Sequence, residues 1–216
     1  MYVKTQMTGN PYTIRVDATI PEAVQLMHEK KLKRLPVVDG FNHIKGIITE
    51  GDIQKVSPTK ATSLSIFEIN YLLSKTLVKN AMTKDVLTIS PNALLEEAAV
   101  MMRDRRIGAL VVTDDEEKVV GIITESNIFD AFIELLGFRE TGTRIALQVN
   151  DVPGVMAEVA EVFAAHQINI THIADFRGSF GVSELILRTN ALDTDAIEAE
   201  LTRRGYQIDN VLKTQN

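Results

Sequence analysis

The 216-residue sequence contains no cysteine and no tryptophan, and aromatic residues make up only 6% of it. Without cysteine, the chain has no disulfide, no thiolate nucleophile and no Cys-ligated zinc. The four histidines are too scattered along the chain to indicate a metal site, and we predict none: His28, His43, His166 and His172. Structural roles are expected for His166, at the end of a predicted helix, and for His172, in a predicted strand.

Long hydrophobic runs are also missing. No window approaches the roughly 18 apolar residues of a membrane span. The segment Met1–Thr5 lacks the long apolar core of a signal peptide. A cytoplasmic protein without a membrane partner is therefore expected.

Cationic residues are in the minority: 23 Lys and Arg stand against 29 Asp and Glu, and the net charge is −6. A dedicated nucleic-acid binder usually has a basic domain or stripe, so no nucleic-acid partner is expected. The one basic cluster consists of Lys30, Lys31, Lys33 and Arg34. It is interpreted as the solvated end of a helix, with a role near a bound phosphate as the alternative.

Motifs of well-known catalytic sites are absent as well. The sequence has no Gly-x-Ser-x-Gly elbow, no phosphate-binding P-loop, no metal-spaced histidines and no dinucleotide fingerprint. Asp and Glu are plentiful, but no pair stands out. We therefore predict no catalytic residue and no cofactor, and we expect a protein that is not an enzyme.

An internal repeat is the strongest positive signal. Residues 7–53 align with residues 82–128 without a gap, and 17 of the 47 positions are identical. The longest match is Gly46–Glu50 with Gly121–Glu125. Chance does not produce such agreement at a fixed offset of 75 residues, so the sequence contains a duplicated structural unit.

The first copy of the repeat is predicted to form a β-α-β-β-α unit. Thr19, followed by Pro21 and Glu22, has the spacing of a helix capping box. Residues 35–39 and 44–49 are predicted strands joined by a turn, and a further helix is expected near Asp52.

The second copy repeats this pattern, with strands predicted at residues 110–112 and 119–124. Each copy would expose a sheet face too apolar to face water alone. The two copies are therefore expected to pack together.

The segment Gly46–Asp52 lies where a predicted buried strand turns into a helix. Gly46 permits close approach of another backbone or of a ligand. Thr49 and Asp52 are spaced as a capping box, and a helix cap alone is one interpretation. In the other, the helix N-terminus and Thr49 bind a phosphate, while Asp52 accepts hydrogen bonds from ribose hydroxyls.

The pattern Gly-hydrophobic-x-Thr/Ser-x-x-Asp/Asn occurs at this junction in both copies, after the strands Leu-Pro-Val-Val-Asp and Leu-Val-Val-Thr-Asp. On these features each copy resembles the CBS domain, and residues 1–135 resemble a CBS pair. The resemblance implies a cleft between the copies that binds an adenosyl compound such as AMP, ATP or S-adenosylmethionine.

Matched position by position, the resemblance implies two nucleotide sites. The first would have Thr49 at the phosphate, Asp52 at the ribose and the remaining residues around the adenine: Thr13, Ile14, Arg34, Leu35 and Pro36. The second would use the equivalent residues: Thr88, Ile89, Ala109, Leu110, Thr124 and Asn127. Asn127 departs from the stronger pattern, because an amide accepts through one oxygen only. The first site is therefore predicted to be the better one, and the second weak or empty.

The stretch between the copies, residues 55–73, contains Ser57-Pro58, which should end the preceding helix. Ser63 or Ser65 then begins a predicted connecting helix, for which a dimer contact or a lid over the cleft is the alternative. The stretch resembles the corresponding part of AcuB-like acetoin-utilisation proteins, which also join a CBS pair to an ACT domain. This resemblance implies a role in acetoin utilisation.

The C-terminal part has a different pattern, after a polar linker predicted at residues 137–143. Strands are predicted at 145–149, 168–176, 182–189 and 206–211, with a hairpin turn at 177–181. One predicted helix starts after the turn Asn150–Gly154, and Asp193 or Thr194 caps another that ends before Gly205. The order β-α-β-β-α-β is that of a ferredoxin-like unit.

The segment Asp151–Met156, followed by Ile168-Asn169-Ile170, resembles the ACT domain. ACT domains pair through their sheets and often bind an amino acid at that interface, where the turn supplies backbone N–H groups for a carboxylate. The resemblance implies these candidates: Asn150, Asp151, Gly154, Val155, Met156 and Ile170. A turn that serves only dimerisation is the alternative.

The expected fold class is α/β (α+β), with two β-α-β-β-α CBS repeats packed as a pair and a ferredoxin-like ACT domain. The expected domains are CBS repeat 1 with its connecting helix (1–75), CBS repeat 2 (76–136) and the ACT domain (143–216). We expect a non-catalytic, homodimeric regulatory protein that senses an adenosyl ligand and acts on an unidentified enzyme. A dimeric interaction module with vestigial ligand sites is the alternative.

Overall fold

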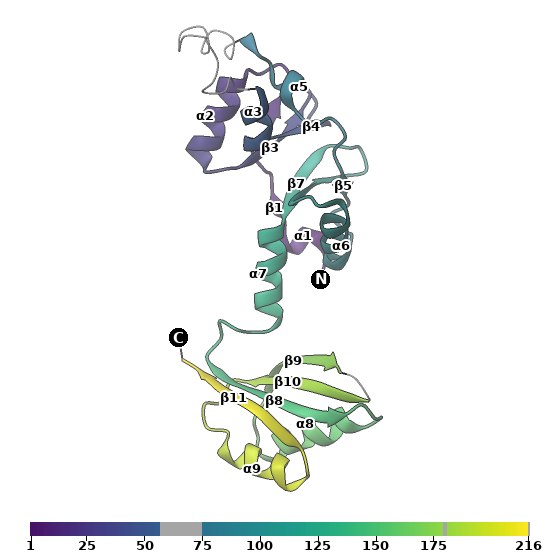
Figure 1. Cartoon of the computed structure of the whole chain (residues 1–216), viewed down its shortest axis with the longest axis vertical. Coiled ribbons are helices and arrows are strands. Elements are labelled where there is room, and N and C mark those ends of the chain that lie inside the picture. Colours follow the sequence, from purple (N-terminus) through teal and green to yellow (C-terminus); the bar gives the residue numbers. More distant parts are fainter. Residues whose placement is uncertain (57–74, 179–180, 216) are drawn as a thin grey trace. The chain divides into compact units, whose positions relative to one another are not determined.

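A computed structural model describes residues 1–56, 75–178 and 181–215 of the chain (Figure 1). Contacts divide it into two units, Met1–Ile128 and Phe129–Asn216. The expected α/β class is confirmed: the first unit contains both copies of the repeat, and the second contains the β-α-β-β-α-β unit. The predicted connecting helix after Ser63 and part of the hairpin turn at 177–181 lie outside the described residues.

The first copy has the predicted order of elements. They are β2 (Ile14–Arg15), α2 (Ile20–Lys30), β3 (Arg34–Val38), β4 (Ile44–Thr49) and α3 (Glu50–Val56). The capping box is confirmed, because the Thr19 N–H donates to Glu22 Oε2 over 2.7 Å and the Glu22 N–H donates back to Thr19 Oγ1. The helix predicted near Asp52 is present: α3 begins at Glu50, Thr49 caps it and Asp52 lies in its first turn.

The second copy repeats these elements. They are β5 (Thr88–Ile89), α6 (Leu95–Arg105), β6 (Ala109–Thr113), β7 (Val119–Thr124) and α7 (Glu125–Leu135). At the start of α6, Leu94 stands where the first copy has Thr19, so no side chain there can cap the helix as a hydroxyl would. Only the Glu97 carboxylate remains, and it accepts from the Leu94 N–H over 3.3 Å.

The copies exchange their N-terminal segments, which the sequence did not predict. Helix α1 (Val3–Gln6) lies beside α6, and β1 (Thr8–Gly9) pairs with β7 of the second copy (Figure 1). Helix α5 (Val78–Ala81) packs in return on α3 and β4 of the first copy. The backbone bonds correspond, because Val3 N donates to Ala93 O over 3.0 Å and Val78 N to Ala18 O over 2.8 Å.

This exchange explains the glycine of the repeated motif. A Cβ on Gly46 would lie 2.9 Å from the Thr83 carbonyl oxygen and would also meet the Met82 side chain. A Cβ on Gly121 would meet the side chain of Met7. Both glycines therefore leave space for the segment that crosses from the other copy. At Gly46 the group that approaches is the backbone of Thr83.

The expected packing of the two copies is present in the first unit. Val38 of one copy and Val111 and Val119 of the other form a shared buried cluster. The hairpin tips also join, since Ile44 N donates to Glu117 O over 3.2 Å. The sheets are ordered β2-β3-β4 and β1-β7-β6-β5.

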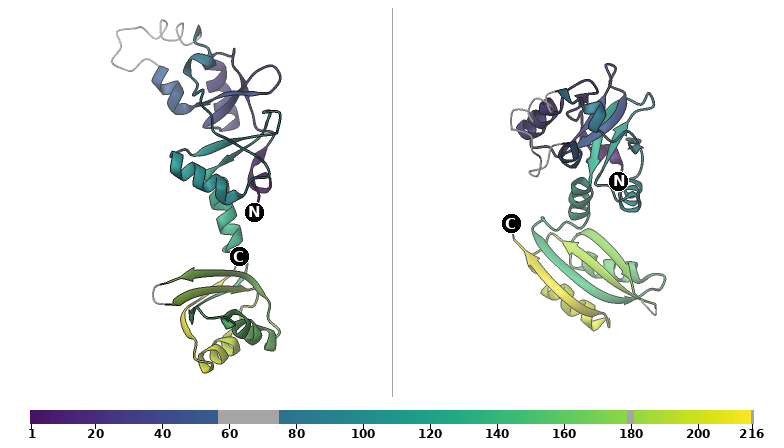
Figure 2. Two further views of the ribbon diagram at one scale, coloured as in Figure 1. Left: turned by 90° about the vertical axis from the view of Figure 1, so that its right-hand side faces the viewer. Right: turned by 45° about the horizontal axis from the view of Figure 1, so that its top comes forward.

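The C-terminal unit is a four-stranded antiparallel sheet, ordered β11-β8-β10-β9, with both helices on one face (Figure 2). Its elements are β8 (Gly142–Asn150), α8 (Val155–Ala165), β9 (Ile170–Arg177), β10 (Val182–Thr189), α9 (Asp195–Arg203) and β11 (Gln207–Thr214). The core lies between helices and sheet and includes Leu147, Phe163 and Leu187.

The predicted linker at 137–143 is too long by two residues, because β8 already includes Gly142 and Thr143. Thr143 is fully buried and donates to Ala191 O over 2.7 Å, a bond that no local pattern reveals.

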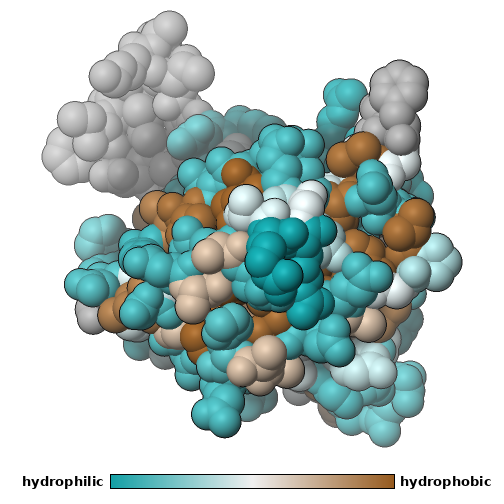
Figure 3. Space-filling view, turned by 90° about the horizontal axis from the view of Figure 1, so that it is seen from below, coloured by the Kyte–Doolittle hydropathy of each residue, from teal (hydrophilic) through white to brown (hydrophobic). Residues whose placement is uncertain are grey.

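Seen from below, hydrophilic residues cover much of the visible face, and hydrophobic patches lie between them (Figure 3). No helix within residues 1–56, 75–178 and 181–215 is long and apolar enough to cross a membrane.

Candidate ligand-binding sites

A cleft of about 580 Å³ lies between the two copies of the repeat. The first copy and its crossing segment contribute Thr8–Tyr12, Lys31–Arg34 and Pro36, and the second contributes Gly108, Ile122 and Thr124–Ser126. The volume is within the range of about 300–1,000 Å³ that is usual for small-molecule sites.

One wall of this cleft contains an exposed aromatic ring. Tyr12 is 52% exposed, and Lys30 Nζ lies 4.9 Å from the centre of its ring. Tyr12 directly precedes the predicted site residue Thr13 but was not itself predicted. Its exposure alone does not single it out, since Tyr2 and Phe41 are 50% and 77% exposed; its place in the cleft does.

Three cationic residues line the same cleft, namely Lys31, Lys33 and Arg34. Lys31 follows α2 in the left-handed conformation, with φ 54°, and the chain then enters β3 at Arg34. Among the residues described, none of these three side chains forms a hydrogen bond or an ion pair. The basic cluster thus lies at the cleft, which favours the phosphate alternative over a merely solvated helix end.

The opposite wall is the start of helix α7. Thr124 donates to Asn127 Oδ1 through its N–H over 2.9 Å and through its hydroxyl over 2.8 Å. The only acceptor oxygen of Asn127 is therefore occupied by the cap. Glu125 and Ser126 line the cleft beside it.

The motif of the first copy forms the same cap with one addition. Thr49 donates to Asp52 Oδ2 through its hydroxyl over 2.7 Å and through its N–H over 3.1 Å. Lys55 Nζ donates to the other oxygen, Asp52 Oδ1, over 3.0 Å. Burial raises the pKa of Asp52, but the bonds from Thr49 and Lys55 outweigh burial and hold that pKa below its ordinary value.

The structure brings together predicted residues from different copies. Arg34 and Pro36 of the first copy line one cleft with Thr124 of the second. The other ten predicted residues do not line it: Thr13, Ile14, Leu35, Thr49, Asp52, Thr88, Ile89, Ala109, Leu110 and Asn127.

The assignment of four apolar side chains to the adenine needs correction. Leu35 and Leu110 are fully buried, and Ile14 and Ile89 are each 7% exposed. Leu35 and Ile14 belong to the core of the first copy, where they pack between the sheet and its helices. Side chains this deep in a close-packed core have no surface left for a ligand.

A second groove, of about 710 Å³, runs between α2 and α3 on the first copy. Val24, Met27, Leu32 and Ile53 make it largely apolar. Lys31 and Lys33 of the basic cluster also line this groove, together with Glu50, but none of the predicted nucleotide-binding residues does.

The C-terminal unit has a smaller cavity of about 260 Å³ at the turn before α8. Four of the predicted residues line it: Asp151, Gly154, Val155 and Met156. Gly154 has φ 100°, a conformation that favours glycine. Of the other two, Asn150 lines a neighbouring cavity of about 350 Å³, and Ile170 packs against the core.

Two further residues of this cavity were missed by the sequence analysis. Ser183, on β10, is 2% exposed, and its buried hydroxyl has no hydrogen-bond partner among the residues that the structure describes. Asp175, on β9, supplies a carboxylate to the same wall. Strand periodicity would have put Ser183 on the buried face together with Leu185, but it would not have shown that its hydroxyl lacks a partner.

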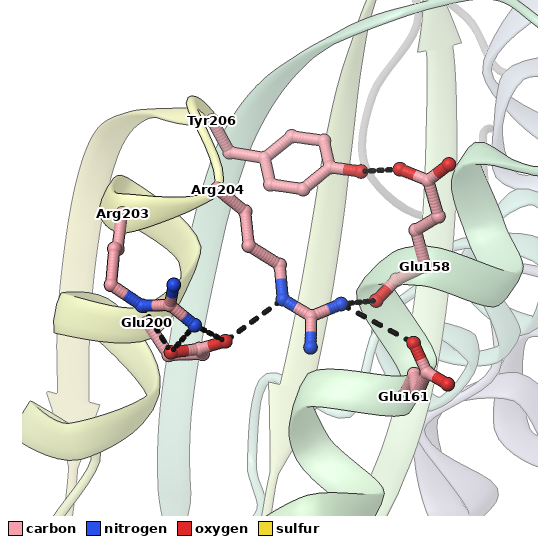
Figure 4. A network of polar contacts seen from close by, with 6 residues as sticks. All are labelled: Glu158, Glu161, Glu200, Arg203, Arg204 and Tyr206. Atoms are coloured by element: carbon pink, nitrogen blue, oxygen red, sulfur yellow. Dashed lines mark hydrogen bonds and ion pairs between the residues drawn. The ribbon is translucent and has the colours of Figure 1, made fainter.

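A polar network joins the two helices of this unit (Figure 4). Arg204 Nε donates to Glu200 Oε1 over 2.9 Å, and its Nη1 donates to Glu161 Oε2 over 3.3 Å. The Tyr206 hydroxyl donates to Glu158 Oε2 over 2.8 Å, and burial together with this bond raises the pKa of Tyr206. The network links α8 to α9 beside the cavity of about 350 Å³.

The histidines make local contacts. His43 Nδ1 lies 3.2 Å from Asp39 Oδ2, His172 Nε2 lies 3.7 Å from a Glu140 oxygen, and His166 follows the last turn of α8. Within the described parts of the chain, no three His, Asp or Glu side chains gather as a metal site would require.

Comparison with protein families gives two matches. The CBS domain family matches residues 3–58 and 78–134, and the ACT domain family matches residues 143–205. Both are regulatory modules, and these ranges cover the two copies and most of the C-terminal unit.

Similar sequences occur as short proteins and as parts of longer ones. A CBS domain-containing protein of Dictyostelium discoideum is 30% identical over 134 residues, which are 62% of this chain and 92% of that protein. A homoserine O-acetyltransferase of Methanocorpusculum labreanum is 34% identical over 128 residues, which are 59% of this chain and 23% of that enzyme. The similar region is thus less than a quarter of the enzyme.

Three solved structures resemble the CBS pair. An acetoin utilization protein (AcuB) from Vibrio cholerae is 29% identical, with a TM-score of 0.54 over 64% of this chain and 95% of its own. CBSX2 in complex with AMP is 26% identical, with a TM-score of 0.52 over 62% and 96%. A CBS domain pair in complex with 5′-methylthioadenosine and S-adenosyl-L-methionine is 27% identical, with a TM-score of 0.51 over 61% and 99%.

Proposed function

Because this chain belongs to the CBS domain family and joins a CBS pair to an ACT domain, we propose that it is a regulatory protein that senses an adenosyl compound and is not an enzyme. The observation that carries the proposal is the cleft of about 580 Å³ between the copies, which is lined by the half-exposed ring of Tyr12 and by the cationic side chains of Lys31, Lys33 and Arg34. Similar CBS pairs that bind AMP, 5′-methylthioadenosine and S-adenosylmethionine support it.

The cleft offers separate surfaces for the parts of such a ligand. The Tyr12 ring is a stacking platform for adenine, and Pro36 and Ile122 provide apolar contact beside it. The hydroxyl of Ser126, at the start of the 11-residue helix α7, is a hydrogen-bond donor for the polar end of the ligand. The ligand would thus contact both copies at once.

A sensor must convert binding into a change that a partner detects. A ligand that contacts both copies can shift their arrangement only if it binds one arrangement more tightly than another. We propose a cytoplasmic homodimer whose regulated enzyme is unidentified. Its similarity to the acetoin utilization protein of Vibrio cholerae favours an enzyme of acetoin utilisation.

The motif of the first copy is proposed as a second nucleotide site. Asp52 Oδ1 is bonded only to the exposed Lys55, whose side chain is 77% exposed. A ribose hydroxyl can replace or share this bond more readily than it can displace Thr49 from Oδ2. Asp52 thus has a second acceptor oxygen, Oδ1, besides the one in the helix cap. Asn127 has no second acceptor oxygen, because its amide nitrogen is a donor.

The test is thermal unfolding of the full chain against adenosine, AMP, ATP, 5′-methylthioadenosine and S-adenosylmethionine. A ligand at ~100 times its Kd should stabilise the protein by about 2.7 kcal/mol, a shift of several degrees. Tyr12→Ala should abolish the shift. Tyr2→Ala is the matched control, because Tyr2 is also half exposed with a lysine over its ring.

A panel without any shift would refute nucleotide sensing and leave a dimeric interaction module with vestigial sites. Equal losses in Tyr2→Ala and Tyr12→Ala would refute the assignment of the cleft.

An amino acid is proposed as a second ligand, at the ACT domain. The unpartnered, buried hydroxyl of Ser183 in the cavity of about 260 Å³ favours this function. The N-terminus of α8 suits a carboxylate, and Asp151 and Asp175 suit an ammonium group.

Ser183→Ala gives a sharp test, because removing an unpaired buried hydroxyl should leave the free protein equally stable or more stable. The same substitution should remove the thermal shift caused by an amino acid, whereas the exposed control Ser90→Ala should retain it. An unchanged shift in Ser183→Ala would contradict this second site.

A further inference from the structure

We propose that the cleft between the copies discriminates among adenosyl compounds by charge and selects those with phosphate groups. This inference rests on the proposed adenosyl site and specifies which ligands that site prefers. It follows from the distribution of charge along the cleft.

The cleft contains three cationic side chains and a single carboxylate. Lys31, Lys33 and Arg34 enter it from one copy, and Glu125 enters it from the other. Within the described residues the three cations have no anionic partner. An unpaired cation at a cleft favours an anionic ligand, because the field of neighbouring charges adds up in a partly enclosed space.

Some other cations of this unit are paired. Lys55 is bonded to Asp52, Lys118 to Glu116, and Arg15 bonds Asp17 through its Nε over 2.9 Å. The side chains of four cations elsewhere on this unit, Lys79, Lys84, Arg105 and Arg106, also form no hydrogen bond or ion pair among the described residues. What distinguishes Lys31, Lys33 and Arg34 is that all three line one cleft.

Arg34 is positioned by a difference between the copies. A Cβ on Gly108 would lie 3.4 Å from both terminal nitrogens of Arg34 and 3.0 Å from Glu125 Oε2. The residue of the first copy that is equivalent to Gly108 is Lys33. The residue of the second copy that is equivalent to Arg34 is Ala109. The absence of a side chain at Gly108 leaves room for the guanidinium group beside α7.

The polar groups across the cleft suit the same ligand. Ser126 and the first turn of α7 face the cations, and helix α7 has 11 residues, long enough for its N-terminus to attract an anion. Glu125 repels a phosphate, so the phosphates would lie towards the lysines. Arg34 would bridge the two regions.

Adenosyl compounds differ strongly in charge. Adenosine and 5′-methylthioadenosine carry no charge, and the sulfonium group of S-adenosylmethionine is positive beside the ribose. A phosphate monoester such as AMP has a charge of about −2 at neutral pH, and ATP has more. The cleft should therefore bind ATP and AMP more tightly than adenosine, and adenosine more tightly than S-adenosylmethionine.

The experiment is isothermal titration of the full chain with ATP, AMP, adenosine and S-adenosylmethionine, at low salt and at physiological ionic strength. Lys33→Gln/Arg34→Gln should weaken ATP binding by on the order of tenfold and leave adenosine nearly unchanged. The control Lys79→Gln/Arg105→Gln removes one lysine and one arginine that do not line the cleft. It should bind ATP like the unmodified chain.

Salt gives an independent readout. ATP affinity should fall as salt rises, because ions screen the attraction, whereas adenosine affinity should not. Equal binding of ATP, adenosine and S-adenosylmethionine would overturn the charge selection and leave the adenosyl site intact. An equal loss for ATP and adenosine in Lys33→Gln/Arg34→Gln would do the same. No binding of any of the four would refute the proposed function itself.

Discussion

The two copies of the repeat are alike where they fold and unlike where they face the cleft. Leu35 and Leu110 are identical and fully buried. Several residues that line the cleft differ from their equivalents, since Tyr12 corresponds to Leu87 and Arg34 to Ala109, although Thr124 and Glu125 match Thr49 and Glu50. Identity between the copies thus marks the shared scaffold, and divergence marks the side that is specialised for binding.

The aspartates of the two hairpin turns illustrate the first half of this rule. Asp39 Oδ1 accepts from the N–H groups of Phe41 and His43, over 2.9 and 3.0 Å. Asp114 Oδ1 accepts in the same way from Glu116 and Lys118. Each aspartate was retained because it closes a turn.

The motif at the end of β4 and β7 illustrates the second half. Asp52 is bonded to Lys55, but the position equivalent to Lys55 in the second copy is Asp130. An aspartate at position 127 would therefore lie one helical turn from another carboxylate. Asparagine keeps the cap of α7 without this repulsion, which explains the departure at Asn127.

The largest effect should come from positions where the copies agree. Leu35→Ala and Leu110→Ala should each lower the free energy of unfolding by about 2–5 kcal/mol, since each leaves a cavity in a buried core. Urea unfolding followed by circular dichroism measures both. Val100→Ala, at a site 56% exposed, is the control and should cost less than about 0.5 kcal/mol. A loss below about 1 kcal/mol for only one of the leucines would break the equivalence of the copies.

The two motif glycines should separate the copies more sharply. Gly46→Ala places a methyl group against the Thr83 carbonyl oxygen, and overpacking of this kind costs about 1–3 kcal/mol. The three atoms nearest to a Cβ on Gly121 all belong to the flexible side chain of Met7, so the cost of Gly121→Ala should be under about 1 kcal/mol. The same unfolding assay compares them, and a larger loss for Gly121→Ala would contradict the crossing described for Thr83.

Replacing the capping aspartate of the first copy by the asparagine of the second should have a smaller, pH-dependent effect on the free energy of unfolding. Asp52→Asn should cost about 1 kcal/mol at pH 7 through the lost bond to Lys55. The folded pKa of Asp52 is lowered, so its stabilisation is present above the ordinary value of about 3.9 and disappears as pH falls through the folded pKa. The difference from the unmodified chain should therefore shrink between pH 5 and pH 3.

The reverse exchange sharpens this test. Asn127→Asp should bring no comparable gain, because Asp130 stands where the first copy has Lys55. Lys55→Gln should reproduce most of the loss seen in Asp52→Asn. A pH-independent loss for Asp52→Asn would show that the carboxylate charge does not contribute.

The smallest difference in stability loss between the two copies is expected at the aspartates of the hairpin turns. Burial raises the pKa of Asp39, but bonds from Phe41, His43 and Lys45 outweigh it and leave that pKa well below its ordinary value. Asp39→Asn should therefore destabilise the chain slightly more than Asp114→Asn at pH 7. The excess should shrink progressively as pH falls below about 4, where the carboxylates of the unfolded chain become protonated, and should be lost as pH falls through the lower pKa of folded Asp39. Thermal unfolding at several pH values compares the two variants, and equal losses at every pH would contradict the role of His43 and Lys45.

Much of the local structure was predictable because it depends on local patterns. The strands β4, β7 and β10 begin and end at the predicted residues, and the capping box of α2 follows from Thr19, Pro21 and Glu22 alone. Alternating hydrophobicity and cap chemistry act over a few residues, so the sequence contains that information directly. The repeat and the resemblances added the order of the domains.

The sequence by itself thus determined the elements, the duplication and a cap at each motif. Only the tertiary structure decided which residues meet across the copies. An alignment pairs equivalent positions, whereas the reciprocal packing of the copies puts Arg34 and Pro36 beside Thr124. The exchange of α1 and α5 was equally hidden, because four-residue helices are too short to show a hydrophobic period. Their place is decided by the burial of Val3 and Val78 in the partner copy, which is a contact between distant parts of the chain.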